Sequence, residues 1–82
     1  MEKYFITFRS VTYAQKGERI LKEQRIRCIL QRTPRWMESR GCGYALEVRD
    51  PKAAVKALAE KGADWKKLYR LSGDTIREVG EP

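Results

Sequence analysis

The spacing of apolar residues switches repeatedly between a period of two and a period of three to four, which restricts the folds open to 82 residues. Alternating or β-branched segments predict strands, whereas apolar stripes at helical spacing predict helices. The predicted strands are Lys3–Phe8, Ile26–Arg32, Gly43–Arg49 and Trp65–Leu71. The predicted helices are Val11–Gln24 and the segment from Pro51 to Lys61. Ser10 stands at the N-cap of the first helix, and Asp50-Pro51 starts the second.

This element order predicts an α+β fold. We expect a ferredoxin-like βαββαβ sandwich, in which two helices cover one face of a four-stranded antiparallel sheet with strand order 4-1-3-2. Residues 1–72 would form this single ferredoxin-like domain. Ser72-Gly73-Asp74 ends the last predicted strand, and residues 73–82 are expected to form a polar C-terminal tail, with one short additional strand as the alternative.

The charge of the chain favours anionic partners. It has 18 basic and 11 acidic side chains and no histidine, for a net charge of +7. Between residues 25 and 49 every basic residue is arginine, whose planar guanidinium group suits oxyanions; ordinary solvated charges are the alternative. With no membrane-spanning or signal-like apolar stretch, we expect a soluble cytoplasmic protein. Two distant cysteines without histidine predict no metal site, and we expect no cofactor.

A cysteine between two glycines is the main candidate functional group. Cys42 lies between Gly41 and Gly43, and Arg35 and Arg40 are close to it in sequence. The glycines allow positive φ and expose backbone N–H groups, while the guanidinium groups would favour the thiolate over the thiol. This pattern predicts a reactive thiol. The alternative is a glycine-shaped turn around a small buried cysteine.

The expected strand order adds two residues to this candidate site. If the third strand runs antiparallel to the first, its start lies beside the end of the first strand, so Cys42 would neighbour Arg9 and Ser10. The N-terminus of the first helix would then add partial positive charge there. Cys28 would pair near Glu47, too far along the strand for a disulfide, and is expected to belong to the core.

Several segments resemble a known family. Tyr4–Phe8, Thr33-Pro34-Arg35 and above all Cys42-Gly43-Tyr44-Ala45-Leu46 are similar to small bacterial selenium/sulfur carrier-like domains. The resemblance implies that Cys42 accepts sulfur or selenium as a persulfide or selenosulfide and passes it on, with Arg35 as its motif partner. The implied partners are a donor, such as a cysteine desulfurase, and an acceptor protein. Trp36, Met37 and Arg40 depart from the serine-rich loop of the family.

Two further questions stay open at this point. Trp36 and Met37 are expected either to dock a partner protein or to fold back over the small core. Without histidine, cysteine–histidine hydrolysis is excluded, which favours a carrier or accessory protein over a stand-alone enzyme.

The alternative functions involve no thiol chemistry: a small basic RNA-binding module, or a regulatory or assembly module. For RNA binding, Phe5 could offer a stacking surface on the open face of the sheet, but Glu47 on that face would repel phosphate.

Overall fold

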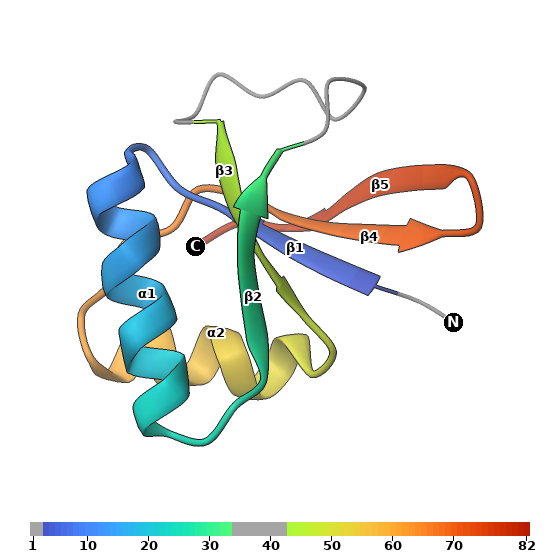
Figure 1. The fold of residues 1–82 in the computed structure, drawn as a ribbon. Helices are drawn as coiled ribbons and strands as arrows, with labels where there is room; N and C mark the ends of the chain where they lie inside the picture. The colour runs from blue at the N-terminus through green and yellow to red at the C-terminus, as the bar shows by residue number, and fades with distance from the viewer. Residues whose placement is uncertain (1–2, 34–42) are drawn as a thin grey trace.

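The computed structural model describes residues 3–33 and 43–82, which contain five strands and two helices. In chain order the elements are β1 (Lys3–Thr7), α1 (Val11–Glu23), β2 (Cys28–Arg32), β3 (Tyr44–Val48), α2 (Pro51–Glu60), β4 (Leu68–Ser72) and β5 (Thr75–Gly80). Figure 1 shows α1 and α2 on one side of the molecule and the β4–β5 hairpin projecting away from α1.

The sheet corrects the predicted fold. It contains five antiparallel strands in the order β2-β3-β1-β4-β5, so the prediction of a four-stranded ferredoxin-like sandwich is wrong, although the α+β class fits. Within this larger sheet, the first four strands stand in the expected order. The additional strand, β5, comes from the segment for which a polar tail was expected, with one short additional strand as the alternative that the structure bears out.

The fifth strand forms because the segment after β4 is a hairpin turn. Ser72 pairs with Thr75, which leaves Gly73-Asp74 as a two-residue connection. Gly73 has φ +62°, a value that glycine adopts without steric cost and that suits the first central position of such a turn. The sequence signal interpreted as the end of the sheet therefore reverses the chain and returns it along β4.

Two carboxylates from the C-terminal segment form ion pairs with one lysine. Lys67 Nζ lies 3.0 Å from Glu78 Oε2 and 2.9 Å from Glu81 Oε2. The backbone next to this lysine is tied to β1, because Thr7 N donates to the Lys67 carbonyl at 2.9 Å and Lys66 N donates to the Thr7 carbonyl at 2.7 Å. The end of the chain is thereby connected through Lys67 to the centre of the sheet.

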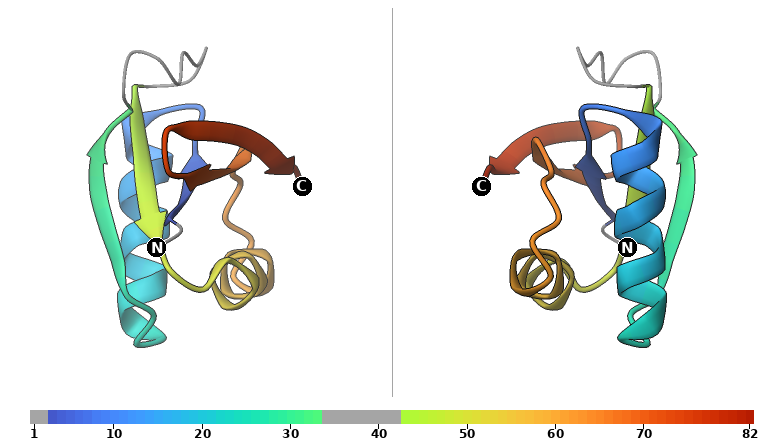
Figure 2. Two further views of the ribbon diagram at one scale, coloured as in Figure 1. Left: turned by 90° about the vertical axis from the view of Figure 1, so that its right-hand side faces the viewer. Right: turned by 90° about the vertical axis from the view of Figure 1, so that its left-hand side faces the viewer.

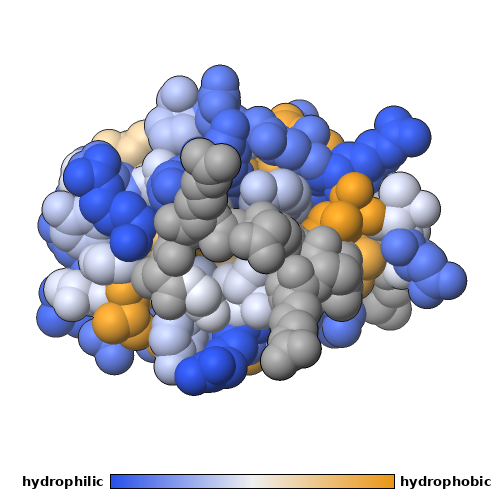
Figure 3. All heavy atoms as spheres, turned by 90° about the horizontal axis from the view of Figure 1, so that it is seen from above, coloured by the Kyte–Doolittle hydropathy of each residue, from blue (hydrophilic) through white to orange (hydrophobic). Residues whose placement is uncertain are grey.

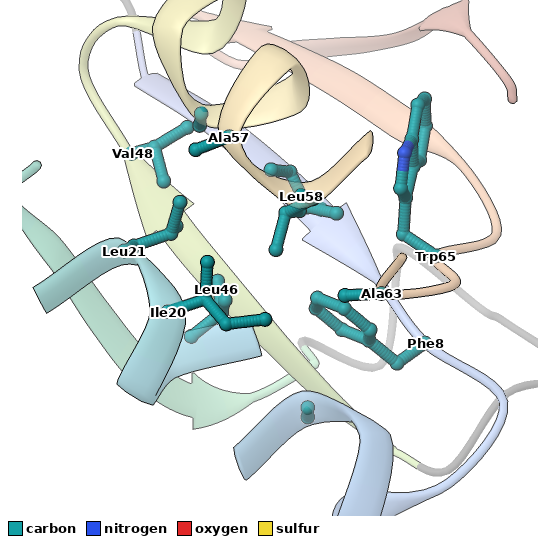
Figure 4. Packing of buried hydrophobic residues seen from close by; sticks show 12 residues of the cluster. Phe8, Ile20, Leu21, Leu46, Val48, Ala57, Leu58, Ala63 and Trp65 are labelled. Atoms are coloured by element: carbon teal, nitrogen blue, oxygen red, sulfur yellow. The ribbon is translucent and has the colours of Figure 1, made fainter. Parts of the chain in front are cut away.

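Both helices pack on the same face of the sheet and share one hydrophobic core. Ile6 from β1 and Phe8 just after it meet Leu46 from β3, Leu21 from α1 and Leu58 from α2, and all five side chains are fully buried. Figure 4 shows how side chains from the helices and the strands converge in this cluster, and Figure 2 shows the two helices relative to the sheet. Trp65, at 8% exposure, closes the cluster, as expected for a core residue.

Local signals start both helices as predicted. Ser10 is the N-cap of α1, and its Oγ accepts a hydrogen bond from Tyr13 N at 3.3 Å. Asp50 is the N-cap of α2, where its Oδ1 accepts from Ala53 N at 3.1 Å and Pro51 occupies the first turn. These caps satisfy backbone donors that a helix start would otherwise leave without a partner.

Candidate functional site

Gly43 marks one end of the sheet, where β2 finishes and β3 begins. Its φ is +82°, so the backbone adopts the left-handed conformation that glycine allows, and its carbonyl accepts from Thr33 N at 2.8 Å. The residue is exposed. Viewed from this end, the described surface is mostly hydrophilic, with smaller apolar patches (Figure 3).

The start of α1 lies at the same end of the sheet. Thr7, the last residue of β1, pairs with Ala45, so Arg9 follows β1 at the end of the sheet where Gly43 precedes β3. Ser10 follows directly and caps α1 with its hydroxyl oxygen. The structure therefore brings three predicted site residues, Arg9, Ser10 and Gly43, to one edge. The guanidinium carbon of Arg9 lies 5.5 Å from the ring centroid of Tyr13, a cation–π distance.

Arg32 adds a second positive charge that sequence reasoning did not select. It pairs with Tyr44 across β2 and β3, and its guanidinium carbon lies 5.7 Å from the Tyr44 ring centroid. Its position near Gly43 could be inferred only from the register of β2 against β3, because Arg32 is distant from Gly43 along the chain. Next to it, the buried Thr33 Oγ1 has no hydrogen-bond partner in the described part of the chain, which is uncommon for a buried polar atom.

The remaining predicted site residues lie outside the described residues. They are Arg35, Trp36, Met37, Arg40, Gly41 and Cys42. Their predicted roles as thiol, anion-stabilising groups and docking side chains therefore stay predictions.

Cys28 lies in a different setting from the predicted reactive thiol. It is half-buried against the core beside α1, and its Sγ lies 3.9 Å from the Glu18 carbonyl oxygen, within reach of a weak hydrogen bond. Desolvation by burial raises the pKa of the Cys28 thiol, and the negative charge of Glu18 raises it further against the opposing effect of Lys22. A raised pKa reduces the thiolate fraction, so Cys28 is poorly suited to nucleophilic chemistry near neutral pH.

Strand pairing also separates Cys28 from Gly43. Cys28 pairs with Val48 at the far end of β3, about 16 Å from Gly43 at about 3.3 Å per residue. This agrees with the expectation that Cys28 pairs near Glu47. The two ends of β3 are thus distinct chemical environments.

Phe5, the residue expected to stack with RNA bases on the open face of the sheet, is covered. Phe5 is only 4% exposed, and Glu47 pairs with it directly on the neighbouring strand. Gln31 Nε2 donates to Glu47 Oε1 at 2.7 Å, and Lys3 Nζ lies 3.9 Å from Glu47 Oε2. Phe5 therefore does not offer its ring for stacking, and the carboxylate beside it disfavours phosphate.

Two further features concern the described residues alone. Across 3–33 and 43–82, no three acidic, cysteine or histidine side chains gather as they would around a metal ion. Neither helix within these ranges combines the length and the apolar character that crossing a lipid bilayer requires.

Comparison with known proteins identifies one family. No curated protein matches the chain, and no solved structure matches it. The sequence model of the family described as "Putative Se/S carrier protein-like" matches residues 3–70. This match spans most of the chain and confirms the family resemblance seen in the sequence. The chain therefore belongs to the Se/S carrier protein-like family.

Proposed function

We propose that this protein carries sulfur or selenium on Cys42 as a persulfide or selenosulfide. The observation that carries the proposal is the family match, which spans residues 3–70 and so includes Cys42. The setting of Cys28 supports it by elimination, because burial raises the pKa of that thiol and lowers its reactivity. Cys42 is the other cysteine of the chain.

The proposed transfer is an exchange between sulfur atoms. The Cys42 thiolate attacks the outer sulfur of a persulfide on the donor protein, and a new bond forms between Cys42 Sγ and that sulfur. The S–S bond of the donor breaks at the same time, and the donor cysteine leaves as a thiolate. One S–S bond replaces another, so the step needs no external oxidant or reductant. Delivery to an acceptor thiolate repeats the exchange in the opposite sense.

The charge at the Gly43 end of the sheet supports an anionic cargo. Arg32 ends β2 and Arg9 follows the end of β1, both at the end of the sheet where Gly43 lies, and the N-terminus of α1 adds partial positive charge. A persulfide ends in an anionic sulfur at neutral pH, which such groups would stabilise. In this proposal Arg35, Arg40 and the backbone N–H groups of Gly41 and Gly43 complete the anion-binding surface.

The chain without histidine has no imidazole to act as general base, which favours a carrier that depends on partner enzymes. We assign Trp36 and Met37 to docking of the donor or acceptor. A cysteine desulfurase is the donor that fits sulfur as the cargo. The proposal places the protein in the cytoplasm, where thiols remain reduced between transfers.

The test is intact-mass spectrometry after incubation with a cysteine desulfurase and cysteine. The wild-type protein should gain about 32 Da, the mass of one sulfur atom, and the reductant dithiothreitol should remove it. Cys28→Ser should still gain this mass, whereas Cys42→Ser should not. With a selenium donor the expected gain is about 79 Da.

A mass gain on Cys42→Ser equal to that of the wild type would contradict the assignment of the thiol. Loss of the gain in both single variants would instead indicate a dithiol mechanism. Arg9→Gln and Arg32→Gln should slow loading without preventing it, and Arg19→Gln on the exposed side of α1 is the matched control for a lost positive charge.

A further inference from the structure

A second basic region lies at the opposite end of β3 from Gly43. Here a surface pocket of about 400 Å³ opens between the end of α1, the start of β2 and the end of β3. Its lining includes two arginines, Arg27 and Arg49, together with the apolar side chains of Ile26 and Ile29 and the side chain of Cys28. In Figure 1 this is the end of β2 that follows the C-terminus of α1. A pocket of this volume can hold a small organic molecule.

The two arginines line the same pocket. Each lies one residue beyond Cys28 and Val48, the last paired residues at this end of β2 and β3. Like charges at neighbouring strand ends repel each other. Among residues 3–33 and 43–82, neither arginine has an ion-pair partner. A bound anion would relieve this repulsion.

The acidic groups near the pocket are already engaged. Glu47 lines it, but its carboxylate accepts from Gln31 at 2.7 Å and lies 3.9 Å from Lys3 Nζ. Lys22, also in the lining, pairs with Glu18 at 3.2 Å. The charges that no described carboxylate neutralises are therefore the two guanidinium groups.

We propose that this pocket binds a small molecule with a phosphate monoester joined to an apolar or aromatic group. Two guanidinium groups in one pocket match the double negative charge and the several acceptor oxygens of a phosphate monoester. Ile26 and Ile29 provide apolar surface for the organic part. The pocket and Gly43 lie at opposite ends of β3.

Cys28 supplies a reporter inside the pocket. We would use Cys42→Ser protein, in which Cys28 is the remaining thiol, and measure its alkylation by uncharged iodoacetamide at about pH 8, where phenyl phosphate is a dianion. Phenyl phosphate, inorganic phosphate and phenol are compared at equal concentration and constant ionic strength. With a Kd of about 10 mM, about 20 mM phenyl phosphate should slow alkylation about threefold.

The variants Arg27→Gln and Arg49→Gln should each raise the Kd for phenyl phosphate about tenfold, the cost of one charge-assisted hydrogen bond, so that about 20 mM phenyl phosphate slows alkylation only about 1.2-fold. Arg77→Gln is the matched control, because it removes an exposed arginine from β5 and should leave protection unchanged. Circular dichroism melting checks that each variant is folded. Having two arginine variants keeps the test valid if one of them fails to fold.

Several results would overturn the proposal. They are the absence of saturable protection, equal protection by phenol or by inorganic phosphate, and equal weakening by Arg77→Gln. Protection by a single-stranded oligonucleotide without protection by phenyl phosphate would overturn it as well, and would indicate a nucleic-acid surface. Because the protein used in this assay lacks Cys42, the result of the assay is independent of the sulfur-transfer experiment.

Discussion

Replacing Gly17 by alanine tests how closely α1 approaches the sheet. Gly17 is buried in the middle of α1, and a Cβ placed there would lie 2.9 Å from Cζ of Phe8 and 3.3 Å from Cδ1 of Leu46. The distance to Phe8 is shorter than carbon atoms tolerate. Phe8 and Leu46 are both fully buried, so neither side chain can move aside into solvent.

Two effects of opposite sign determine the result. Alanine at an interior helix position favours folding over glycine by about 1 kcal/mol. Forcing a methyl group into a filled core costs about 1–3 kcal/mol. We therefore expect Gly17→Ala to lower the free energy of unfolding by about 1 kcal/mol, which corresponds to about 4–8 °C in Tm for a domain of this size.

Urea denaturation with a double-mutant cycle measures this effect. Phe8→Leu shortens the side chain that the new methyl group would meet, so the pair Gly17→Ala/Phe8→Leu should be less destabilised than the sum of the single variants by about 1 kcal/mol. Lys16→Ala, on the exposed face of the same helix, controls for helix propensity and should change stability by less than about 0.5 kcal/mol. An increase in stability for Gly17→Ala would refute the close approach.

Three other outcomes are expected. In protein lacking the other cysteine, alkylation of Cys28 should show a pKa above that of an ordinary cysteine thiol. Glu18→Gln should lower this pKa only in part, because burial is the larger cause, and an unchanged pH profile would exclude an effect of the carboxylate. Gly43→Ala should destabilise the fold by about 1–2 kcal/mol in thermal melts because of its positive φ, whereas Gly80→Ala, without positive φ, should not. Lys67→Met should speed amide exchange in β5 near neutral pH. Lys67 lowers the pKa of Glu81, so protonation of Glu81 at acid pH removes the ion pair, and the difference between variant and wild type should shrink as the pH falls through that lowered pKa. A difference that does not depend on pH would exclude the ion pair as the cause.

The parts of the fold that sequence could predict are those with local causes. Ser10 and Asp50 indicate helix starts because each can cap a backbone N–H three residues later, and the structure shows both caps. The sequence pattern predicts the start of the fourth strand too early, at Trp65. This residue is buried in the core, but it precedes β4, which begins at Leu68. A single apolar side chain does not distinguish a strand from a buried connection.

The fifth strand depends on contacts that a linear pattern does not reveal. Gly73-Asp74 is compatible with both a chain end and a hairpin, and the sequence after it has little apolar alternation. What holds β5 is pairing with β4 and the packing of Ile76 against the cluster of Phe5 and Ala45, while the exposed ion pairs of Lys67 contribute little. Contacts with residues distant in sequence determine whether a weakly predicted strand forms more than the intrinsic β-propensity of its residues does.

The candidate site likewise contains residues that the sequence could predict and residues that it could not. Arg9, Ser10 and Gly43 could be brought together in advance because strand order alone implies their proximity. Arg32 was not selected, although the register that pairs Cys28 near Glu47 also brings it close to Gly43; its contact with the Tyr44 ring is seen only in the structure. The pocket beside Arg27 and Arg49 also depends on that register and on where α1 ends.

The position of β5 also has a consequence for solubility at high concentration. As an outermost strand it leaves one side of its backbone open to pairing with another chain, which is a common route to aggregation. Arg77 and Glu78 occupy the middle of this strand and are exposed. In a symmetric antiparallel pair of two such strands, either Arg77 or Glu78 at the centre would face its own copy, so like charges would meet. The strand thus carries its own protection against growth of the sheet from one molecule into the next.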